Sequence, residues 1–245
     1  PYVLGLARAL MAAGWDVLAW NFRSCGGVMN RQPRFYHSGA TEDLEIVINH
    51  ALGKSYQNLF LSGFSMGGNL TLLYLGQQGE QVDSRISGAV VYSVPADLAG
   101  SADMLALPSR KIYMQRFLND LHGKMQEKSE LFPDLIDVSG FRDIRNFHEF
   151  DNRYTAPLHG FKDAQDYWEN CSALFRLKDI RVPSLMINAA DDPFLSPACF
   201  PDSKKVLGSY VKLEVPKWGG HVGFVEHAKD GYYWSERRAL MFVGS

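Results

Sequence analysis

The pentapeptide G-F-S-M-G at 63–67 carries the strongest chemical signal in the sequence. It stands between a predicted strand at 58–62 and a predicted helix at about 66–77. A serine in such a sharp strand-to-helix turn holds its hydroxyl oxygen clear of the backbone. Glycines two residues before and after the serine would let strand and helix pass closely. The motif could also be a glycine-rich turn whose serine only caps the helix. We predict that Ser65 is a nucleophile and that the Met66 N–H donates to an oxyanion.

A nucleophilic serine needs a base that is oriented by an acid, and both residue types follow Ser65 in the chain. Asp191 and Asp192 come directly after one predicted strand, and His221 comes after the next. Parallel sheets place their sites beyond the carboxyl ends of their strands. We predict that Asp192, which precedes a proline, is the acid and that His221 is the base. In this assignment Asp191 could cap the turn. The reverse assignment, with Asp191 as the acid, stays open.

Other polar residues could compete for these roles. Asp97 also follows a predicted strand, where we expect it to cap a helix. Glycines flank His221 and would let the backbone bring its imidazole close to the serine, so it is preferred over the other histidines. These are His37, His50, His122, His148, His159 and His227.

Two groups of residues could be considered as metal ligands. They are His221 with Glu226 and His227, and His148 with Glu149 and Asp151. Neither group has the spacing that places two imidazoles on one helical face. We expect no metal and no cofactor, because the chemistry of a serine, histidine and aspartate triad is self-contained.

Strand and helix signals alternate through the first hundred residues and return after residue 178. Helical spacing is found at 3–13 and 41–50, and a last helix is expected at 235–243. Strands are predicted at 16–22, 58–62, 88–93, 183–189 and 210–215. Continuous apolar strands joined by helices indicate an α/β fold with a mostly parallel sheet covered on both faces.

The alternation stops between residues 96 and 178, where the sequence is helix-like, aromatic and charged. We predict a helical cap inserted into one domain that spans 1–245, with its core at 1–95 and 179–245. The aromatic residues of such a cap could line an acyl channel, although they more often form a small core of their own. The residues expected to contact an apolar acyl group are Phe64, Phe117, Phe147 and Trp168.

The composition argues against several classes of protein. The formal net charge is −2, which gives no reason to expect nucleic acid or an anionic membrane as a partner. Cys25, Cys171 and Cys199 are too sparse for a disulfide framework or a zinc site, and they favour a reducing, cytoplasmic location. No apolar run approaches the roughly 18 residues that a membrane span needs. Oligomeric state is not determined by these properties.

Several separate segments together resemble the YheT-like branch of the α/β-hydrolases. They are N-F-R-S-C-G-G at 21–27, N-R at 30–31, Y-H-S-G at 36–39, G-F-S-M-G-G-N-L at 63–70, H-G-F at 159–161, D-D-P-F at 191–194 and G-G-H-V-G-F at 219–224. The resemblance runs through nearly the whole chain. It implies an α/β-hydrolase fold, a triad of Ser65, Asp192 and His221, and activity as a carboxylic-ester hydrolase or acyltransferase on small-molecule ester or lipid substrates.

One part of the family pattern lies outside this sequence. The resemblance implies an oxyanion loop with an H-G motif, and strands before it, just upstream of the segment that resembles 1–10. We therefore expect the N-terminal strands and a second oxyanion donor to be missing. One such donor contributes about 10²–10³ in rate, so low activity would follow. A thioesterase, a lipase or an acyltransferase stays possible, as does a binding or scaffold protein with an unused triad.

Overall fold

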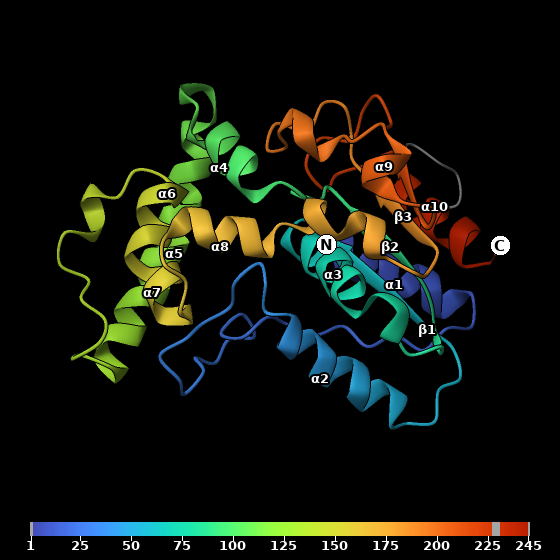
Figure 1. Ribbon diagram of the computed structural model, residues 1–245, viewed down its shortest axis with the longest axis horizontal. Coiled ribbons are helices and arrows are strands. Elements are labelled where there is room, and N and C mark those ends of the chain that lie inside the picture. The colour runs from blue at the N-terminus through green and yellow to red at the C-terminus, as the bar shows by residue number, and fades with distance from the viewer. Residues whose placement is uncertain (1, 227–230, 245) are drawn as a thin grey trace.

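A computed structural model describes residues 2–226 and 231–244 of the chain. Its sheet has four parallel strands in the order β1-β2-β3-β4 (Figure 1). The strands are β1 (Leu59–Phe64), β2 (Ile86–Tyr92), β3 (Ser184–Ile187) and β4 (Val211–Glu214). Phe64 pairs with Tyr92, Tyr92 with Ile187, and Ile187 with Glu214. All four strands therefore end in register, and the loops that follow them meet at one edge of the sheet.

Different helices cover the two faces of the sheet. Successive side chains of a strand point to opposite faces, and β2 shows the consequence. Its Ala89 and Val91 belong to the apolar cluster that contains α3 (Met66–Gln78) and α2 (Thr41–Leu52). Its Val90 and Tyr92 belong to the cluster that contains α1 (Tyr2–Ala12) and α10 (Trp234–Val243). The fold class predicted from the sequence, a parallel sheet with helices on both faces, is confirmed.

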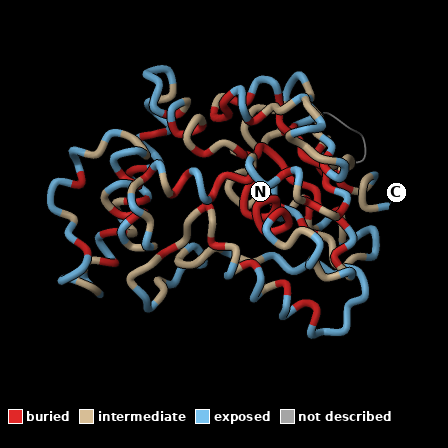
Figure 2. Tube along the Cα trace, viewed as in Figure 1, coloured by how far each residue is buried: buried red, intermediate tan, exposed pale blue. Residues whose placement is uncertain are grey.

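The helix that follows the nucleophile candidate is the most deeply buried one. Every residue of α3 from 68 to 76 is buried, and Figure 2 shows buried residues concentrated in the strands and this helix. A helix that is buried all round must be packed from several sides. It contacts β1 and β2 on the sheet, α2, and the 3₁₀ segment Ala173–Asp179. This packing fixes the start of α3 relative to the strand ends.

A helical insertion separates β2 from β3, as the sequence predicts. It comprises α4 (Leu98–Ala106), α5 (Lys111–Leu131), α6 (Phe147–Phe150), a π-helical turn (Asp151–Thr155), α7 (Ala156–His159) and α8 (Ala164–Cys171). In Figure 1 its helices α4 to α7, drawn in green to yellow, lie beside the sheet rather than on it. The insertion has an apolar cluster of its own, which includes Met114, Met125, Phe141, Phe150 and Tyr154. Many of its aromatic residues therefore stabilise the insertion itself.

The strand predicted at 16–22 is not formed. In the described part of the chain this segment has no regular secondary structure, is not part of the sheet, and is mostly exposed. Leu18, for example, is 57% exposed. An apolar run has the backbone preference of a strand, but a strand forms only where a neighbouring strand supplies hydrogen bonds. The outer edge of β1 is open in the described sheet, but none of the backbone hydrogen bonds between described residues joins this segment to it.

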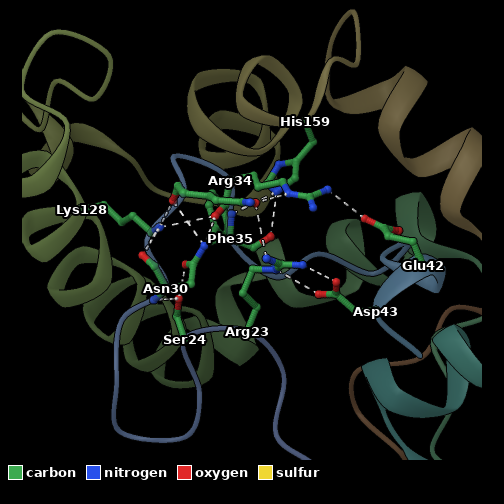
Figure 3. Close-up of polar contacts among 10 residues, drawn as sticks. Arg23, Ser24, Asn30, Arg34, Phe35, Glu42, Asp43, Lys128 and His159 are labelled. Atoms are coloured by element: carbon green, nitrogen blue, oxygen red, sulfur yellow. Dashed lines mark hydrogen bonds and ion pairs between the residues drawn. The ribbon is translucent and has the colours of Figure 1, made fainter. Parts of the chain in front are cut away.

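The segment between α1 and α2 is bound to the insertion (Figure 3). Lys128 of α5 is buried, and its ammonium donates to the carbonyl oxygens of Asn30 at 3.1 Å, Arg34 at 3.3 Å and Gln32. Burial lowers the pKa of Lys128, and the three carbonyls replace the water that the ammonium has lost. Nε2 of His159 lies 2.8 Å from the carbonyl oxygen of Phe35. These contacts join the insertion to a segment that leads into α2.

A buried carboxyl group lies at the centre of the insertion. The oxygens of Asp151 accept hydrogen bonds from Oγ1 of Thr155 at 2.5 Å and from Nε1 of Trp168 at 2.9 Å. Burial raises the pKa of Asp151 to about 6, against the opposing effect of the two hydrogen bonds. The folded chain therefore binds a proton at Asp151 more tightly than the unfolded chain does. Its contribution to stability is full below the ordinary aspartate pKa and is lost as the pH rises through about 6.

We predict that Asp151→Asn removes this pH dependence. Asparagine has a similar shape and cannot ionise, so the variant should gain stability relative to the parent as the pH rises from about 4 to 7, by about 3 kcal/mol. Urea unfolding of both proteins across this pH range measures the difference. Asp103→Asn, at an exposed position of α4, is the matched control. A difference that does not change with pH would contradict the prediction.

Candidate active site

The turn at Ser65 has the strained backbone that the sequence predicts. Ser65 has φ 52° and ψ −121°, a conformation that costs a residue with a side chain of order 1–3 kcal/mol. Its N–H donates to the carbonyl oxygen of Tyr92 at 2.8 Å, and its own carbonyl accepts from the N–H groups of Gly68 and Asn69 at 2.9 and 3.1 Å. The end of β2 and the first turn of α3 thus hold the serine from both sides.

The glycines of this turn have different roles from those that the motif suggests. A Cβ atom on Gly63 would lie 2.3 Å from the carbonyl oxygen of Gly67, so only glycine fits two residues before the serine. Two residues after it, a Cβ on Gly67 would meet only the ring of Phe22, at an ordinary 3.7 Å. The tight position is Gly68, whose Cβ would lie 2.7 Å from a methyl group of Val94. The expectation that both flanking glycines permit the close crossing is correct for Gly63 and wrong for Gly67.

A continuous chain of hydrogen bonds connects the three predicted triad residues. Nε2 of His221 lies 2.9 Å from Oγ of Ser65. Nδ1 of the same imidazole lies 3.0 Å from Oδ2 and 3.2 Å from Oδ1 of Asp192. The Asp192 side chain is 0% exposed, and its Oδ1 also accepts from the N–H of Phe194 at 3.0 Å. The three residues come from loops after β1, β3 and β4, which end in register.

The second aspartate holds the histidine loop instead of the imidazole. Oδ1 of Asp191 accepts from the backbone N–H of Gly220 at 2.8 Å, one residue before His221. Gly219 is needed here because its Cβ would lie 2.7 Å from both Ala189 and Phe224, and Gly220 has φ 54°. The glycines beside His221 therefore allow the close approach that the sequence predicts for them.

One residue that supports the histidine loop was not predicted from the sequence. Oγ of Ser93 accepts from the N–H of Val222 at 3.0 Å. Val222 is β-branched and has φ 59°, a conformation that such residues rarely adopt without external support. Ser93 directly follows β2, where parallel sheets gather functional side chains, and that position was the available signal.

This arrangement fixes which protons can move. When Nδ1–H of His221 donates to Asp192, Nε2 has a free lone pair that can accept the hydroxyl proton of Ser65. The Met66 N–H lies in the first turn of α3, where helical N–H groups have no partner within the helix. It can therefore donate to an oxyanion that forms on a group bonded to Ser65.

The four aromatic residues predicted to contact substrate lie in three different surroundings. Phe64 stacks on Tyr92 at 4.8 Å, in the packing between sheet, α1 and α10. Trp168 is buried in the core and donates to Asp151, which contradicts the channel-lining role expected for it. Phe117 and Phe147 contact each other at 5.7 Å on the insertion.

Phe194 connects the insertion to the triad. Its ring lies 4.3 Å from the imidazole of His221, measured between centroids, and 6.0 Å from the ring of Phe117. Phe194 belongs to the D-D-P-F segment that was noted in the sequence, but no role could be assigned to it from sequence spacing. Phe194 is far from Phe117 in the sequence, so the sequence alone could not predict that the two rings are in contact.

The competing polar residues have partners elsewhere. Asp97 caps α4 by accepting from the N–H of Gly100 at 3.2 Å, as expected. His37 and His159 contact each other at 4.4 Å between ring centroids, and burial lowers the pKa of His37 to about 3. His122 stacks on Phe141. His50 is exposed on α2, and His227 lies outside the described residues.

The first group of possible metal ligands, His148, Glu149 and Asp151, does not converge. His148 contacts Asn152, Glu149 accepts from the N–H of Arg145, and Asp151 accepts from Thr155 and Trp168. The other group includes His227, so the described residues do not test it as a whole.

Comparisons with known proteins give one family. The profile of the alpha/beta hydrolase fold matches residues 2–228. The protein named "Putative esterase YheT" of Escherichia coli is 33% identical over 234 residues, which are 92% of this chain and 66% of that protein. The phospholipase ABHD3 of Mus musculus is 30% identical over 92% of this chain and 55% of its own length. The chain therefore spans less than two thirds of these relatives.

A solved structure with the same fold is the Pyrococcus furiosus esterase Pf2001. It aligns with a TM-score of 0.58 at 16% identity, over 99% of this chain and 76% of that one. Within the part of the chain that is described, no helix is both long enough and apolar enough to cross a membrane.

We predict that Gly67→Ala and Gly68→Ala have opposite effects on stability. Alanine at 67 meets only an ordinary contact and favours the helix. The free energy of unfolding should therefore be unchanged or higher by up to about 1 kcal/mol, and the melting temperature should not fall. Alanine at 68 clashes with Val94 inside the core and should cost about 1–3 kcal/mol. Thermal unfolding followed by circular dichroism compares the two variants with the parent. Equal losses for both would contradict the distinction.

Proposed function

Because this chain belongs to the alpha/beta hydrolase family, we propose that it is a serine hydrolase of carboxylic esters, of the esterase or lipase type, with Ser65 as nucleophile. The observation that carries the proposal is the hydrogen-bonded chain from Ser65 through His221 to the buried Asp192. A scaffold protein would have no need to keep a strained serine and a buried carboxylate in line with one imidazole. The names of the relatives, an esterase and a phospholipase, support the same class of reaction.

In the proposed first step, Oγ of Ser65 attacks the acyl carbonyl while Nε2 of His221 takes the hydroxyl proton. The negative charge that develops on the carbonyl oxygen faces the Met66 N–H at the start of α3. The imidazolium is stabilised by Asp192, which has no contact with water and keeps its charge directed at Nδ1. His221 then gives its proton to the departing alcohol, and the acyl group stays on Ser65.

In the second step, His221 removes a proton from water, which attacks the acyl-serine and releases the carboxylic acid. The same imidazole returns the proton to Oγ, so the enzyme is regenerated. The proton transfers and the bond changes use only Ser65, His221 and water, and a second oxyanion donor, expected to be missing from this chain, would add to the rate. A thiol ester would follow the same path, and an alcohol in place of water would give acyl transfer.

We propose that the acyl group of the ester, whose carbonyl Ser65 attacks, is apolar. Phe194 lies against His221, and Phe117 and Phe147 extend this aromatic surface onto the insertion. Aromatic side chains beside the base can exclude water and thereby strengthen the electrostatic interactions of the triad. In this proposal the insertion at 96–178 acts as a cap of a single domain rather than as a separate one.

We predict that Ser65→Ala abolishes ester hydrolysis, because loss of the nucleophile in a triad enzyme costs on the order of 10⁶ in turnover. Turnover of a short-chain p-nitrophenyl ester and labelling by a fluorophosphonate probe measure the effect. The variant should keep the parent's circular dichroism spectrum, since no core contact is removed. A parent chain that the probe does not label, or a variant that still hydrolyses the ester, would overturn the assignment.

We predict that the two neighbouring aspartates differ strongly in their effect on turnover. Asp192→Asn should cost about 10⁴, because an amide favours the wrong tautomer of His221. Asp191→Asn should cost far less, because the amide oxygen can still accept from the N–H of Gly220. Esterase kinetics on both variants give the comparison. The reverse order of effects would identify Asp191 as the acid.

A further inference from the structure

The start of α5 exposes large apolar side chains that the triad does not use. Ile112 is 84% exposed and Tyr113 is 46% exposed. Leu107, in the turn before the helix, and Phe117, one turn further on, are 41% and 36% exposed. Single exposed apolar residues are common, but four within eleven residues form a surface that calls for an explanation.

The same stretch carries positive charge. Between 107 and 117 the sequence contains Arg110, Lys111 and Arg116 and no carboxylate, although the whole chain has a formal charge of −2. Among the residues that the structure describes, none of these three cations forms an ion pair with a carboxylate. Lys111, Ile112 and Arg116 line one shallow groove of about 470 Å³, so apolar and cationic groups share a face. The net charge of the chain conceals this local excess.

The surface is continuous with the triad. The rings of Tyr113 and Phe117 lie 4.9 and 6.0 Å from the ring of Phe194, which contacts His221. Nε of Arg110 donates to the carbonyl oxygen of Pro193 at 3.0 Å, in the loop that carries Asp192. A molecule bound along the start of α5 therefore lies next to the loop that carries the acid and to Phe194, which contacts the base.

We propose that this α5 surface, formed by Leu107, Lys111, Ile112, Tyr113, Arg116 and Phe117, binds the surface of an anionic lipid membrane. A helix face that combines bulky apolar side chains with cations lies in the plane of a bilayer interface, with its apolar side chains among the acyl chains. Each lysine or arginine near such a surface adds electrostatic attraction to anionic headgroups. The proposal concerns where the protein docks and does not require Ser65 to be catalytic.

The charge distribution favours lipid over a second copy of the chain. A two-fold dimer places the same patch of both copies face to face. Here that would bring the cations of both copies together, and the groove that Lys111 and Arg116 line has one carboxylate, Asp120, among its lining residues. Like charges across an interface weaken association, whereas anionic headgroups neutralise them. The surface is therefore complementary to an acidic lipid layer and not to itself.

Vesicle sedimentation tests the proposal with the full chain carrying Ser65→Ala, so that the lipid is not consumed. Vesicles of phosphatidylcholine alone are compared with vesicles that also contain phosphatidylglycerol. We expect binding to the mixed vesicles that weakens as salt is added. Ile112→Ser should weaken it about tenfold, because an isoleucine side chain loses its burial in lipid. Arg116→Gln should weaken it about fivefold on the mixed vesicles and little on phosphatidylcholine.

Two matched variants control for general changes in the protein. Ile46→Ser removes an isoleucine that is 66% exposed on α2, and Arg142→Gln removes an exposed arginine elsewhere on the insertion. Both should bind vesicles like the parent. Absence of binding to mixed vesicles, or binding that Ile112→Ser and Arg116→Gln leave unchanged, would overturn the proposal. So would a concentration-dependent dimer, measured by analytical ultracentrifugation, that Ile112→Ser abolishes.

The outcome is independent of the proposed esterase function. Hydrolysis of a water-soluble short-chain ester by the chain with Ser65 intact needs no vesicle and reports only on the triad. Ile112→Ser should leave that turnover unchanged, because Ile112 is 84% exposed and is not part of the hydrogen-bonded chain of Ser65, His221 and Asp192. Vesicle binding without ester turnover would support the α5 surface alone, and the reverse result would support the triad alone.

Discussion

The crossing of β1 over the start of α3 is the constraint on which the other features depend. There is no room for a side chain at residue 63, because the backbone of Gly67 occupies the position that a Cβ would need. At this close crossing the chain turns through Ser65, which has φ 52° and ψ −121°. Burial of α3 along most of its length stabilises the turn, since the helix cannot move without opening the core. The reactive oxygen is thus positioned by packing that extends across the sheet.

The in-register ends of the four strands bring the remaining groups to the same place. Loops after β3 and β4 supply Asp192 and His221, and the loop after β2 supplies Ser93. Two of these loops contain residues with positive φ, Ser93 after β2 and Val222 after β4, and hydrogen bonds join the loop of His221 to the other two loops. Asp191 and Ser93 hold the backbone on either side of His221, at Gly220 and Val222. The imidazole is therefore oriented by its neighbours before any substrate is bound.

Two buried polar side chains, Lys128 and Asp151, fix the positions of the helices in the insertion. Lys128 and Asp151 are both removed from water, and both recover the lost hydration through hydrogen bonds to named partners. An unpaired buried charge costs far more than a paired one, so these partners define a single position for the helices around them. One consequence reaches the active site, because Phe117 of α5 then lies against Phe194 and through it beside His221.

The sequence by itself determined the features that depend on neighbouring residues. The turn at Ser65 and the helix at 66–78 that follows it go back to a pentapeptide, and the helix at 41–52 follows from its apolar spacing. The tertiary structure decided the features that depend on contacts with segments that are distant along the chain. The segment at 16–22 has the composition of a strand but forms no backbone hydrogen bonds with the sheet in the described chain. Asp191 and Asp192 are adjacent and chemically identical, and only the folding of the 219–224 loop directs one to the imidazole and the other to a backbone N–H. The physical reason is that backbone preference acts over a few residues, whereas pairing and burial are set by segments that are distant along the chain.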